Sequence, residues 1–273
     1  MPELPEVEVT RLGVSPHLVG QRVSGLVLRR DGLRWPFPAG LKETLVGQRV
    51  IGTARRGKYL LIQFPHGILI IHLGMSGHIR VLPKNTPVQL HDHVDIVLGR
   101  QVLRMTDPRR FGAVLWHDHE NGAIEQHPLL QNLGMEPLTE QFDGTVLYKE
   151  TRQRKITVKQ MLLAGDVVVG VGNIYASESL FMSGISPLTP AGQISRARYQ
   201  RLALAIKQVL AEAIVMGGST LKDFINVNGQ SGYFQQNYFV YNRAGLPCKK
   251  CKTLIRQLKQ GQRSTFYCVK CQK

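Results

Sequence analysis

The chain has 273 residues, of which 35 are Lys or Arg and 19 are Asp or Glu, so its formal charge is +16 at pH 7. Because 43% of the residues are apolar, the composition is that of a globular protein and excludes a disordered chain. No apolar run approaches the roughly 18 residues of a membrane-spanning helix, and the glutamate-rich start MPELPEVEV does not fit a secretory signal. We therefore expect a cytoplasmic protein, and a charge of this size favours nucleic acid as its partner.

Short apolar runs separated by turn residues fill the chain from about residue 20 to residue 120, which predicts an antiparallel β-sandwich or barrel. These runs are Val23–Leu28, Tyr59–Phe64, Ile68–Leu73, His93–Leu98, Val102–Met105 and Ala113–Trp116. From residue 133 onward Gly, Pro and acidic residues replace the pattern, as is typical of a linker. We therefore expect an N-terminal domain over residues 1–132 and a linker over residues 133–150.

Helical periodicity follows the linker. Apolar residues recur at helical spacing from Tyr199 to Ala213, which predicts a helix that ends at Gly217–Gly218. Two further helical stretches, Thr157–Leu163 and Ile174–Phe181, flank the sequence GDVVVGVGN and predict a helix, a tight turn and a second helix. The GVGN segment lacks the last glycine of the G-x-G-x-x-G fingerprint, so we do not expect a dinucleotide site there.

The four cysteines form two Cys-x-x-Cys pairs near the end of the chain, Cys248 with Cys251 and Cys268 with Cys271. Two such pairs joined by a hairpin supply four thiolates in a tetrahedron, which predicts one closed, structural Zn²⁺ site. Disulfides or free thiols are the alternative, but a reducing cytoplasm disfavours disulfides. No acidic residue follows Asp223, so the hairpin, with Arg263 near its tip, is strongly basic and suited to contact phosphates.

The amino terminus begins Pro2-Glu3-Leu4-Pro5-Glu6. Pro5 and the glutamates favour the first turn of a helix, which would give the segment a purely structural role. If Met1 is removed, however, Pro2 presents a secondary amine with a pKa near ~8, which is partly unprotonated at neutral pH. Such an amine can attack an electrophilic sugar carbon and form an iminium. Local chemistry leaves both interpretations open.

Five motifs, in order along essentially the whole chain, resemble the bacterial formamidopyrimidine-DNA glycosylase family. They are PELPEVE at the start, LGMSG at 73–77, TDPRRFG at 106–112, GVGNIYASE at 170–178 and the four-cysteine hairpin. The resemblance implies a bifunctional DNA glycosylase and AP lyase of base excision repair, which removes 8-oxoguanine and formamidopyrimidines from double-stranded DNA. We expect it to act as a monomer, since one copy suffices to extrude one base.

The resemblance also implies an α+β fold. An N-terminal antiparallel β-sandwich with flanking helices is followed by a helix-two-turn-helix domain over residues 151–226 and a four-cysteine zinc-finger hairpin over residues 227–273. The family commonly reads PELPEVET where this chain has PELPEVEV, so Val9 departs from the pattern. We expect this change to alter packing along the first helix and to leave the chemistry intact.

Catalytic roles follow by resemblance for Pro2, Glu3, Lys58 and Arg263. Pro2 is the nucleophile that attacks C1′, and Glu3 is the proton donor for the departing base and for ring opening, so a buried Glu3 is expected. Lys58 transfers protons in β-elimination, and Arg263 acts in δ-elimination and on the phosphates. Without the resemblance, Lys58 is typical of an exposed lysine at a strand edge.

The resemblance further implies that Met75, Arg109 and Phe111 fill the space of an extruded nucleotide, with Arg109 pairing to the orphaned cytosine. Taken singly, Met75 and Phe111 are more typical of a core. Other matches to DNA-contacting positions are His91, Arg154 and Asn173. The segment with Gly218, Ser219, Thr220 and Lys222 resembles the loop that covers the flipped base.

Three alternatives remain. An enzyme of the sister branch would remove oxidised pyrimidines, but Leu4 and the set of Met75, Arg109 and Phe111 argue against it. A non-catalytic zinc-dependent DNA-binding protein would not need Pro2, Glu3 and Lys58. The pattern His91-Asp92-His93 could indicate a metal site, but it lacks further ligands.

Overall fold

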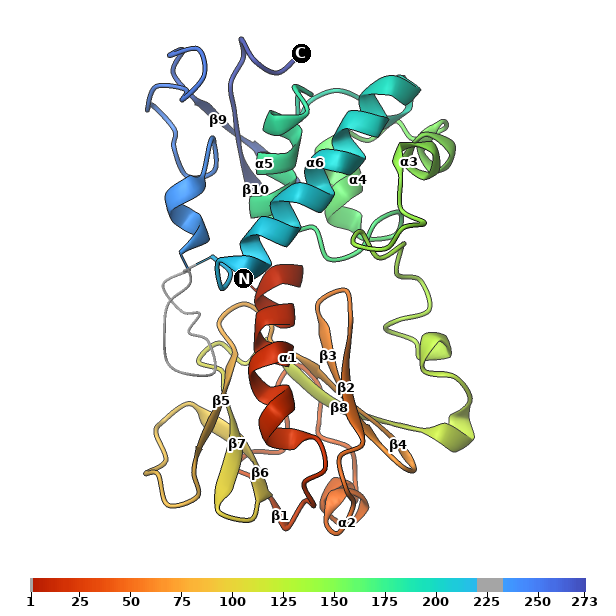
Figure 1. The fold of residues 1–273 in the computed structure, drawn as a ribbon, viewed down its shortest axis with the longest axis vertical. Helices are drawn as coiled ribbons and strands as arrows, with labels where there is room; N and C mark the ends of the chain where they lie inside the picture. Colours follow the sequence, from red (N-terminus) through yellow and green to blue (C-terminus); the bar gives the residue numbers. More distant parts are fainter. Residues whose placement is uncertain (1, 220–232) are drawn as a thin grey trace. The chain divides into compact units, whose positions relative to one another are not determined.

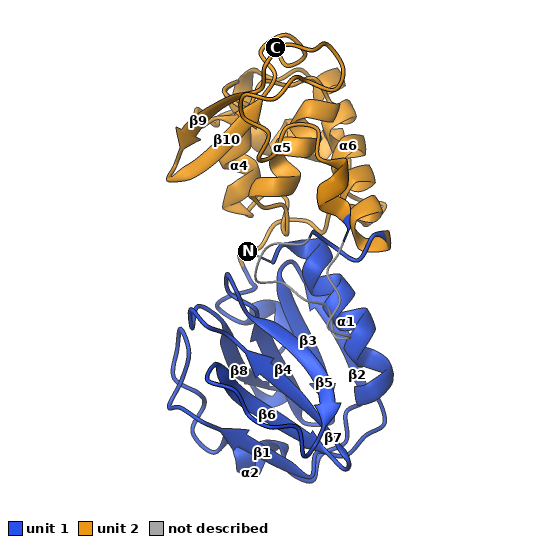
Figure 2. Cartoon of the chain, turned by 90° about the vertical axis from the view of Figure 1, so that its left-hand side faces the viewer, with its two compact units in different colours: residues 1–131, 216–233 blue, residues 132–215, 234–273 orange. Residues whose placement is uncertain are grey.

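The computed structural model of the chain describes residues 2–219 and 233–273 (Figure 1). The chain divides into two compact units, which Figure 2 colours blue and orange. Residues 1–131 and 216–233 form the first, called here the sandwich unit, and residues 132–215 and 234–273 form the second, the helical unit. Within the described ranges, no helix combines the length and apolar character needed to cross a membrane.

The sandwich unit contains two four-stranded antiparallel sheets. The first has the strand order β2 (Gly52–Arg56), β3 (Tyr59–Phe64), β4 (Gly67–His72) and β8 (Ala113–Asp118). The second has the order β1 (Gly25–Leu28), β6 (Asp92–Leu98), β7 (Gln101–Thr106) and β5 (His78–Pro83). Helix α1 (Leu4–Leu18) packs on strands β2, β3 and β5, and the short helix α2 (Leu41–Leu45) packs on β1. Two 3₁₀ turns, η1 (His119–Asn121) and η2 (Ile124–Gln126), follow β8.

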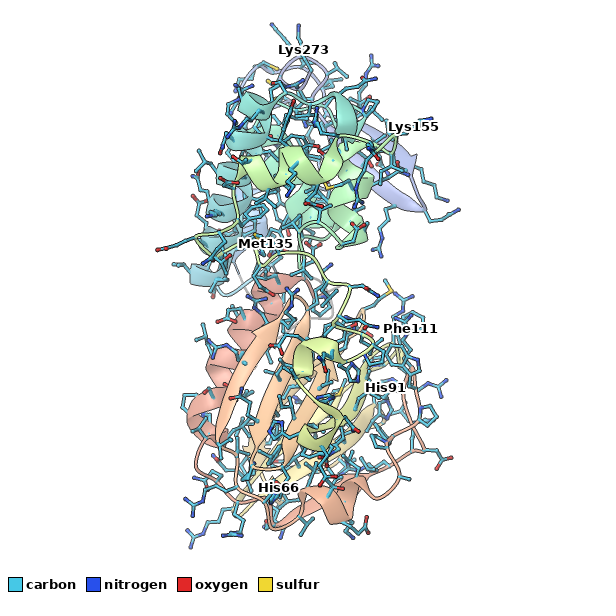
Figure 3. All side chains as sticks on the ribbon, turned by 90° about the vertical axis from the view of Figure 1, so that its right-hand side faces the viewer. His66, His91, Phe111, Met135, Lys155 and Lys273 are labelled. Carbon is cyan, nitrogen blue, oxygen red and sulfur yellow. The ribbon has the colours of Figure 1, made fainter. Side chains whose placement is uncertain are left out.

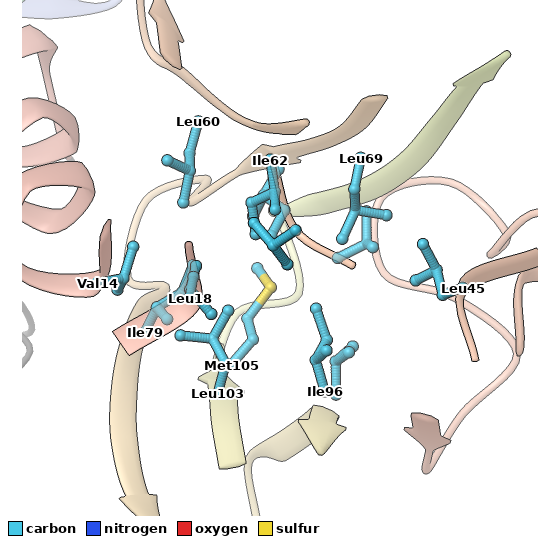
Figure 4. Packing of buried hydrophobic residues seen from close by; sticks show 14 of the residues in the cluster. Val14, Leu18, Leu45, Leu60, Ile62, Leu69, Ile79, Ile96, Leu103 and Met105 are labelled. Carbon is cyan, nitrogen blue, oxygen red and sulfur yellow. The ribbon is translucent and has the colours of Figure 1, made fainter. Parts of the chain in front are cut away.

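The core of the sandwich unit is aliphatic and is shared by both sheets and α1. Leu60 and Ile62 alternate along β3 so that both face inward, as the two-residue period of a strand requires. They meet Ile96 and Leu103 of the second sheet and Leu18 of α1 (Figure 4). Burial of this apolar surface is the main force that holds the two sheets together.

The antiparallel sandwich expected from the apolar runs is confirmed, and each of the six runs contains a strand. Strands β2 and β5 were not predicted, because their sequences, GTARR and HIRVLP, carry polar residues and show little apolar character. Both lie at an edge of their sheet, where polar side chains are common and protect against unwanted strand pairing.

The helical unit contains the predicted pair of helices around a tight turn, α4 (Val158–Ala164) and α5 (Asn173–Met182), and the long helix α6 (Arg196–Val215). Thr157 and Gln160 form a capping box that starts α4, and Gly165 ends it in the left-handed conformation. The 3₁₀ turns η3 (Ala191–Gln193) and η4 (Phe234–Asn237) lie in the same unit. Strands β9 (Arg256–Gln260) and β10 (Arg263–Tyr267) form the C-terminal hairpin.

The second half of the predicted linker 133–150 differs from the expectation, because it forms helix α3 (Gly144–Thr151), which packs against α6. Asp143 starts this helix by accepting hydrogen bonds from the N–H groups of Thr145 and Val146 at 2.8 and 2.9 Å. The acidic residue that suggested a linker is therefore a helix cap. The domain boundaries proposed from the sequence stay predictions.

Candidate functional site

Pro2 and Glu3 lie immediately before α1, and both are buried, with Glu3 only 1% exposed. Glu3 is the N-cap residue of α1, and its N–H donates to Oε2 of Glu6 at 2.8 Å as part of a capping box. Pro5 occupies the first turn, where its missing N–H costs no hydrogen bond. The helix therefore fixes Pro2 and Glu3 at its positive end, where an ammonium on Pro2 is disfavoured if Met1 is removed. The structural and the catalytic interpretations of this segment are compatible.

Glu6 makes a contact with Ser219 that was not predicted from the sequence. This side chain is fully buried, and while Oε2 holds Glu3, Oε1 accepts the N–H of Ser219 at 2.8 Å. Gly218 has φ +83°, and a Cβ there would lie 3.2 Å from the same Glu6 oxygen, so the backbone passes close to the carboxylate. One carboxylate thus joins the segment of Pro2 and Glu3 to the start of the predicted base-covering loop.

Two other residues proposed for that loop, Thr220 and Lys222, lie outside the described residues. The first half of the proposal, Gly218 and Ser219, is placed in the sandwich unit by its contact with Glu6. No repeat or spacing in the sequence joins position 6 to position 219. Only the fold brings them together.

Helix α1 is held on β2 by a half-buried group of ion pairs. Oε2 of Glu8 lies 3.1 Å from Nε of Arg55, and Oε1 lies 2.6 Å from a guanidinium nitrogen of Arg11. Burial raises the pKa of Glu8, but the two guanidinium groups outweigh burial and lower the pKa below its ordinary value. Glu8 is therefore charged at neutral pH and fixes the helix that carries Pro2 and Glu3 to the sheet.

Lys58 lies in the two-residue turn that joins β2 to β3, and it is half-buried. Gly57, the first residue of this turn, has φ +56°, as a tight hairpin connection with glycine in first place requires. Lys58 is therefore at a hairpin tip. The simple interpretation as a solvated lysine at a strand edge does not describe its half-buried position.

The pKa of His72, at the end of β4, depends in part on the charge of Lys58, and the sequence did not single out this histidine. Burial, followed by the positive charges of Lys58 and Arg34, lowers the pKa of His72 to about 4. The imidazole is therefore neutral at pH 7, and Nδ1 accepts the N–H of Gly74 at 3.0 Å. Because Gly74 precedes Met75, the neutral histidine fixes the start of the loop that carries this thioether.

The three residues expected to fill the DNA stack lie on two neighbouring loops. Met75 is half-buried between β4 and β5, whereas Arg109 and Phe111 are exposed between β7 and β8. Phe111 is 44% exposed, and the guanidinium carbon of Arg109 lies 4.8 Å from the centre of its ring. A Cβ on Gly74 would lie 2.4 Å from the carbonyl carbon of Phe111, so the two loops touch backbone to backbone. The alternative that Phe111 is a core residue is excluded.

His91 lies at the same edge of the sandwich unit as Phe111 (Figure 3). Its carbonyl accepts the N–H of Asp107 at 3.0 Å, which connects it to the loop of Arg109 and Phe111. Its ring centre is 6.5 Å from that of His93. Within residues 2–219 and 233–273, the only group of three or more potential metal ligands is formed by the cysteines, so a metal at His91 has no support.

Three predicted DNA-contacting or catalytic residues belong to the helical unit. Asn173 is the first residue of α5, and its amide nitrogen donates to the carbonyl of Ser264 at 3.0 Å, while its Oδ1 has no hydrogen-bond partner among residues 2–219 and 233–273. Arg154 pairs with Asp166 at 2.8 Å and is partly exposed. Arg263 is exposed at the first position of β10. Asn173 and Arg263 therefore flank the same residue of the hairpin, Ser264.

The tip of the hairpin is a two-residue turn in which Gly261 and Gln262 both have positive φ, 50° and 64°. This is the turn geometry that best fits the twist of a two-stranded hairpin. Lys159 of α4, which is fully buried, binds strand β10 of the hairpin. Its Nζ donates to the carbonyl of Ser264 at 2.9 Å and to Oγ1 of Thr265 at 2.8 Å. The hairpin that presents Arg263 is thus anchored to the helices.

Glu178 of α5 provides a second anchor. Its buried carboxylate accepts the N–H groups of three consecutive residues, Phe239, Val240 and Tyr241, at 2.8 to 3.0 Å. Burial raises the pKa of Glu178, although the three N–H donors act in the opposite direction. The chain that leads into the cysteine hairpin is therefore fixed to the helix that begins at Asn173.

The four cysteine sulfur atoms converge, since all four Sγ atoms lie within 4.8 Å of one another. A tetrahedral Zn²⁺ with bonds of about 2.3 Å places its sulfur ligands about 3.8 Å apart, so the cluster fits one zinc ion. Hydrogen bonds from Thr253 lower the pKa of the Cys251 thiol to about 6, whereas burial raises the pKa of Cys268 and raises that of Cys271 to about 12. The convergence of the four sulfur atoms therefore supports a metal site more strongly than the pKa values do. No cysteine forms a disulfide, and the predicted single structural zinc site is confirmed.

Family models match three segments of the chain. The formamidopyrimidine-DNA glycosylase N-terminal domain matches residues 1–114, the formamidopyrimidine-DNA glycosylase H2TH domain matches residues 133–225, and the zinc finger found in FPG and IleRS matches residues 245–273. These descriptions place the chain among DNA glycosylases that carry a zinc finger.

Similar proteins cover the whole chain. The formamidopyrimidine-DNA glycosylase of Herminiimonas arsenicoxydans is 67% identical over 273 residues, which is 100% of both chains. The crystal structure of MutM (Fpg) from Thermus thermophilus matches with a TM-score of 0.89 and 36% identity, over 99% of this chain and 98% of that one. Lactococcus lactis Fpg in complex with a Fapy-dG containing DNA matches with a TM-score of 0.91 and 30% identity, over 99% of this chain and 100% of that one. The chain belongs to the formamidopyrimidine-DNA glycosylase family.

Proposed function

We propose that this chain excises oxidised purines from DNA through a Schiff base on Pro2 and then cleaves the strand by β,δ-elimination, as a monomer in the bacterial cytoplasm. As a family member the chain is a DNA-binding glycosylase and AP lyase of base excision repair that acts on oxidised purines. The proposal adds the residues that perform the reaction and the order of its steps.

The observation that carries the proposal is the buried position of Pro2 and Glu3 at the positive end of α1, in a chain that matches the family from end to end. Two groups with opposite protonation needs lie side by side there. The amine must be neutral to attack, and the carboxyl must hold a proton to give. The positive helix terminus disfavours an ammonium on Pro2 once Met1 is removed.

The reaction begins when the neutral Pro2 nitrogen attacks C1′ of the damaged nucleotide. The bond between C1′ and the base breaks, and the electron pair leaves with the base. Glu3 gives a proton to the departing base, takes up the proton that the Pro2 nitrogen loses, and passes this proton to the ring oxygen as its bond to C1′ breaks, which leaves an iminium between Pro2 and C1′. Loss of a proton from C2′ then expels the 3′ phosphate, with Lys58 as the proton carrier. A second elimination, with Arg263, expels the 5′ phosphate.

DNA recognition is divided between the two units. In the sandwich unit the exposed Arg109 and Phe111, together with Met75, are suited to occupy a gap in the base stack. In the helical unit, Arg154 and Arg263 offer cations for phosphates, and Asn173 offers a helix N-terminus. With a formal charge of +16, the affinity should fall steeply as salt rises.

The experiment that tests the proposal separates chemistry from binding. Replacement of Pro2 by glycine, Pro2→Gly, replaces the secondary amine of the nucleophile with a primary one. We expect excision of 8-oxoguanine from a duplex with cytosine to fall by at least ~100-fold, while binding of the same duplex stays within about threefold. Excision at the wild-type rate would contradict the role of Pro2. Wild-type preference for a thymine glycol duplex would instead identify the pyrimidine-removing sister branch. Tight binding by a wild-type chain that excises neither base would identify a non-catalytic DNA-binding protein or a chain that retains Met1, and mass spectrometry of the N-terminus distinguishes these two.

A further inference from the structure

We propose that Asp107 is a positioning residue that fixes the loops of Met75, Arg109 and Phe111 in the shape required to hold an extruded nucleotide. This inference rests on the proposed function, in which these loops enter the DNA. Asp107 directly follows β7, and it is completely buried although it is an acidic residue next to exposed neighbours. A buried carboxylate is costly unless hydrogen bonds satisfy it, so its partners explain its presence.

The carboxylate of Asp107 joins the two loops. Oδ1 accepts a hydrogen bond from the hydroxyl of Ser76 at 3.1 Å, and Oδ2 accepts the N–H of Gly112 at 2.8 Å. The Ser76 oxygen in turn accepts the N–H of Arg109 at 3.3 Å. Ser76 is the neighbour of Met75, whereas Arg109 and Gly112 lie on either side of Phe111. One carboxylate therefore joins both loops through two hydrogen bonds of its own and a third that runs through Ser76.

The backbone of Asp107 fixes a third segment. Its N–H donates to the carbonyl of His91 at 3.0 Å, and its own carbonyl accepts from Nε2 of His93 at 2.9 Å and from the N–H of Arg110 at 3.2 Å. Burial lowers the pKa of His93, so a neutral ring that donates from Nε2 fits this contact. Asp107 is thus the common partner of three loops that carry predicted DNA contacts.

The loop of Arg109 and Phe111 has little apolar support. Arg109 and Phe111 are exposed, so apolar packing does not fix them, and Arg110 has φ +57°, a conformation that non-glycine residues rarely adopt. A Cβ on Gly112 would lie 3.0 Å from Oδ2 of Asp107, which leaves no room for a side chain between the loop and the carboxylate. Hydrogen bonds to Asp107 therefore join the loops to one another, in addition to the bonds of Gly74 to His72 and of Arg34 to Gly112.

Loop order matters for this reaction because extrusion of a paired base costs several kcal/mol, which the inserted side chains must offset. Loops that are already in the bound conformation do not lose further conformational entropy when they enter the stack. Removal of the Asp107 carboxylate leaves the Ser76 hydroxyl and the Gly112 N–H without their buried acceptor. We expect the loops to relax and extrusion to become harder, while the chemistry at Pro2 is unaffected.

The test compares two substrates under single-turnover conditions. The first is a duplex with 8-oxoguanine opposite cytosine, whose base must be unpaired and extruded. The second is the same duplex with a preformed abasic site, which has no base to extrude. For Asp107→Ala we expect excision to fall roughly 10- to 100-fold, as the loss of buried hydrogen bonds implies, and cleavage at the abasic site to change by less than about threefold.

Two further variants make the result specific to position and chemistry. Asp107→Asn should restore most of the excision rate, because its amide oxygen can accept from Gly112 while its NH₂ group donates to Ser76. Asp95→Asn is the matched control, since Asp95 is a buried carboxylate of the same unit that pairs with Arg104 and Arg29 and contacts none of the three loops. Its excision rate per folded molecule should equal that of the wild type.

Ser76→Ala is the milder variant if Asp107→Ala does not fold, and it should lower excision roughly three- to tenfold with the same difference between substrates. Equal losses on both substrates, or a wild-type excision rate in Asp107→Ala or in a folded Ser76→Ala, would overturn the positioning role. Absence of excision by the wild type would contradict the proposed function itself, independently of any Asp107 variant.

Discussion

Acid should destabilise the protein through His72, whose replacement by asparagine should remove this effect. Burial, Lys58 and Arg34 lower the pKa of His72 to about 4 in the folded chain, whereas an exposed histidine titrates near 6.5. As the pH falls below 6.5, the unfolded chain binds a proton that the folded chain does not. The free energy of unfolding therefore decreases as the pH falls from about 6.5 to about 4. Above this range the contribution of His72 to stability does not change with pH.

The two pKa values set the size of the effect. A difference of this size corresponds to a loss of about 2 kcal/mol of unfolding free energy at pH 5, and of about 3 kcal/mol below pH 4. His72→Asn removes the titrating group but keeps an oxygen that can accept the N–H of Gly74. Burial also lowers the pKa values of His78, His93 and His127, so these histidines add to the pH dependence of the wild type. The contribution of His72 is therefore the difference in unfolding free energy between the wild type and His72→Asn.

Urea denaturation at pH 7.5 and pH 5 measures this difference. The wild type should lose about 2 kcal/mol more than His72→Asn between the two pH values. Tyr59→Phe is the control, because the Tyr59 ring lies 4.9 Å from the His72 ring and the pKa of Tyr59 is raised above its usual value near 10. This variant should keep the wild-type pH dependence. An equal loss of stability in wild type and His72→Asn would refute the assignment of a neutral, buried imidazole.

Two further predictions concern the helical unit. Cys248→Ser should reduce bound zinc from one ion per chain to well below one and weaken DNA binding at least ~10-fold, because the thiolates hold the hairpin that carries Arg263. Metal analysis measures the bound zinc, and a gel shift measures the DNA affinity. Stoichiometric zinc with normal affinity would contradict the structural role of the site. Lys159→Met should lower the free energy of unfolding by about 2–4 kcal/mol, because the Ser264 carbonyl and the Thr265 hydroxyl lose their buried donor. Lys207 is the control, because its exposed Nζ donates one hydrogen bond to a backbone carbonyl. Lys207→Met should lower the free energy of unfolding by less than about 1 kcal/mol. Similar losses in the two variants would argue against anchoring by Lys159.

The features that could be predicted from the sequence are those carried by short contiguous patterns. The spacing of Cys248, Cys251, Cys268 and Cys271 is sufficient to predict the zinc site, because four ligands in two short pairs leave few other arrangements. The apolar strands of the sandwich core follow from their composition for a similar reason. Motifs such as TDPRRFG marked the loop of Arg109 and Phe111, although not how the loop is held.

The features that could not be predicted depend on contacts between distant positions. Glu6 bonds Ser219, Asp107 bonds Ser76, and Glu178 bonds residues 239–241, and in each case the partners share no pattern in the sequence. Asp143 shows the reverse problem, since an acidic residue that is typical of a linker proves to be the cap of α3. The catalytic and DNA-binding roles of Pro2, Glu3 and the other proposed residues stay predictions until they are tested.

The most direct test of the account is borohydride trapping with the tagless protein on a duplex that contains 8-oxoguanine opposite cytosine, followed by identification of the modified residue. Borohydride reduces an iminium to a stable amine, so a Schiff base becomes a permanent bond between protein and DNA. A Pro2 nucleophile predicts a covalent adduct on the nitrogen of Pro2, and none at position 2 in Pro2→Gly. An adduct on a lysine, or excision by the wild type without any adduct, would contradict the central claim that Pro2 is the nucleophile.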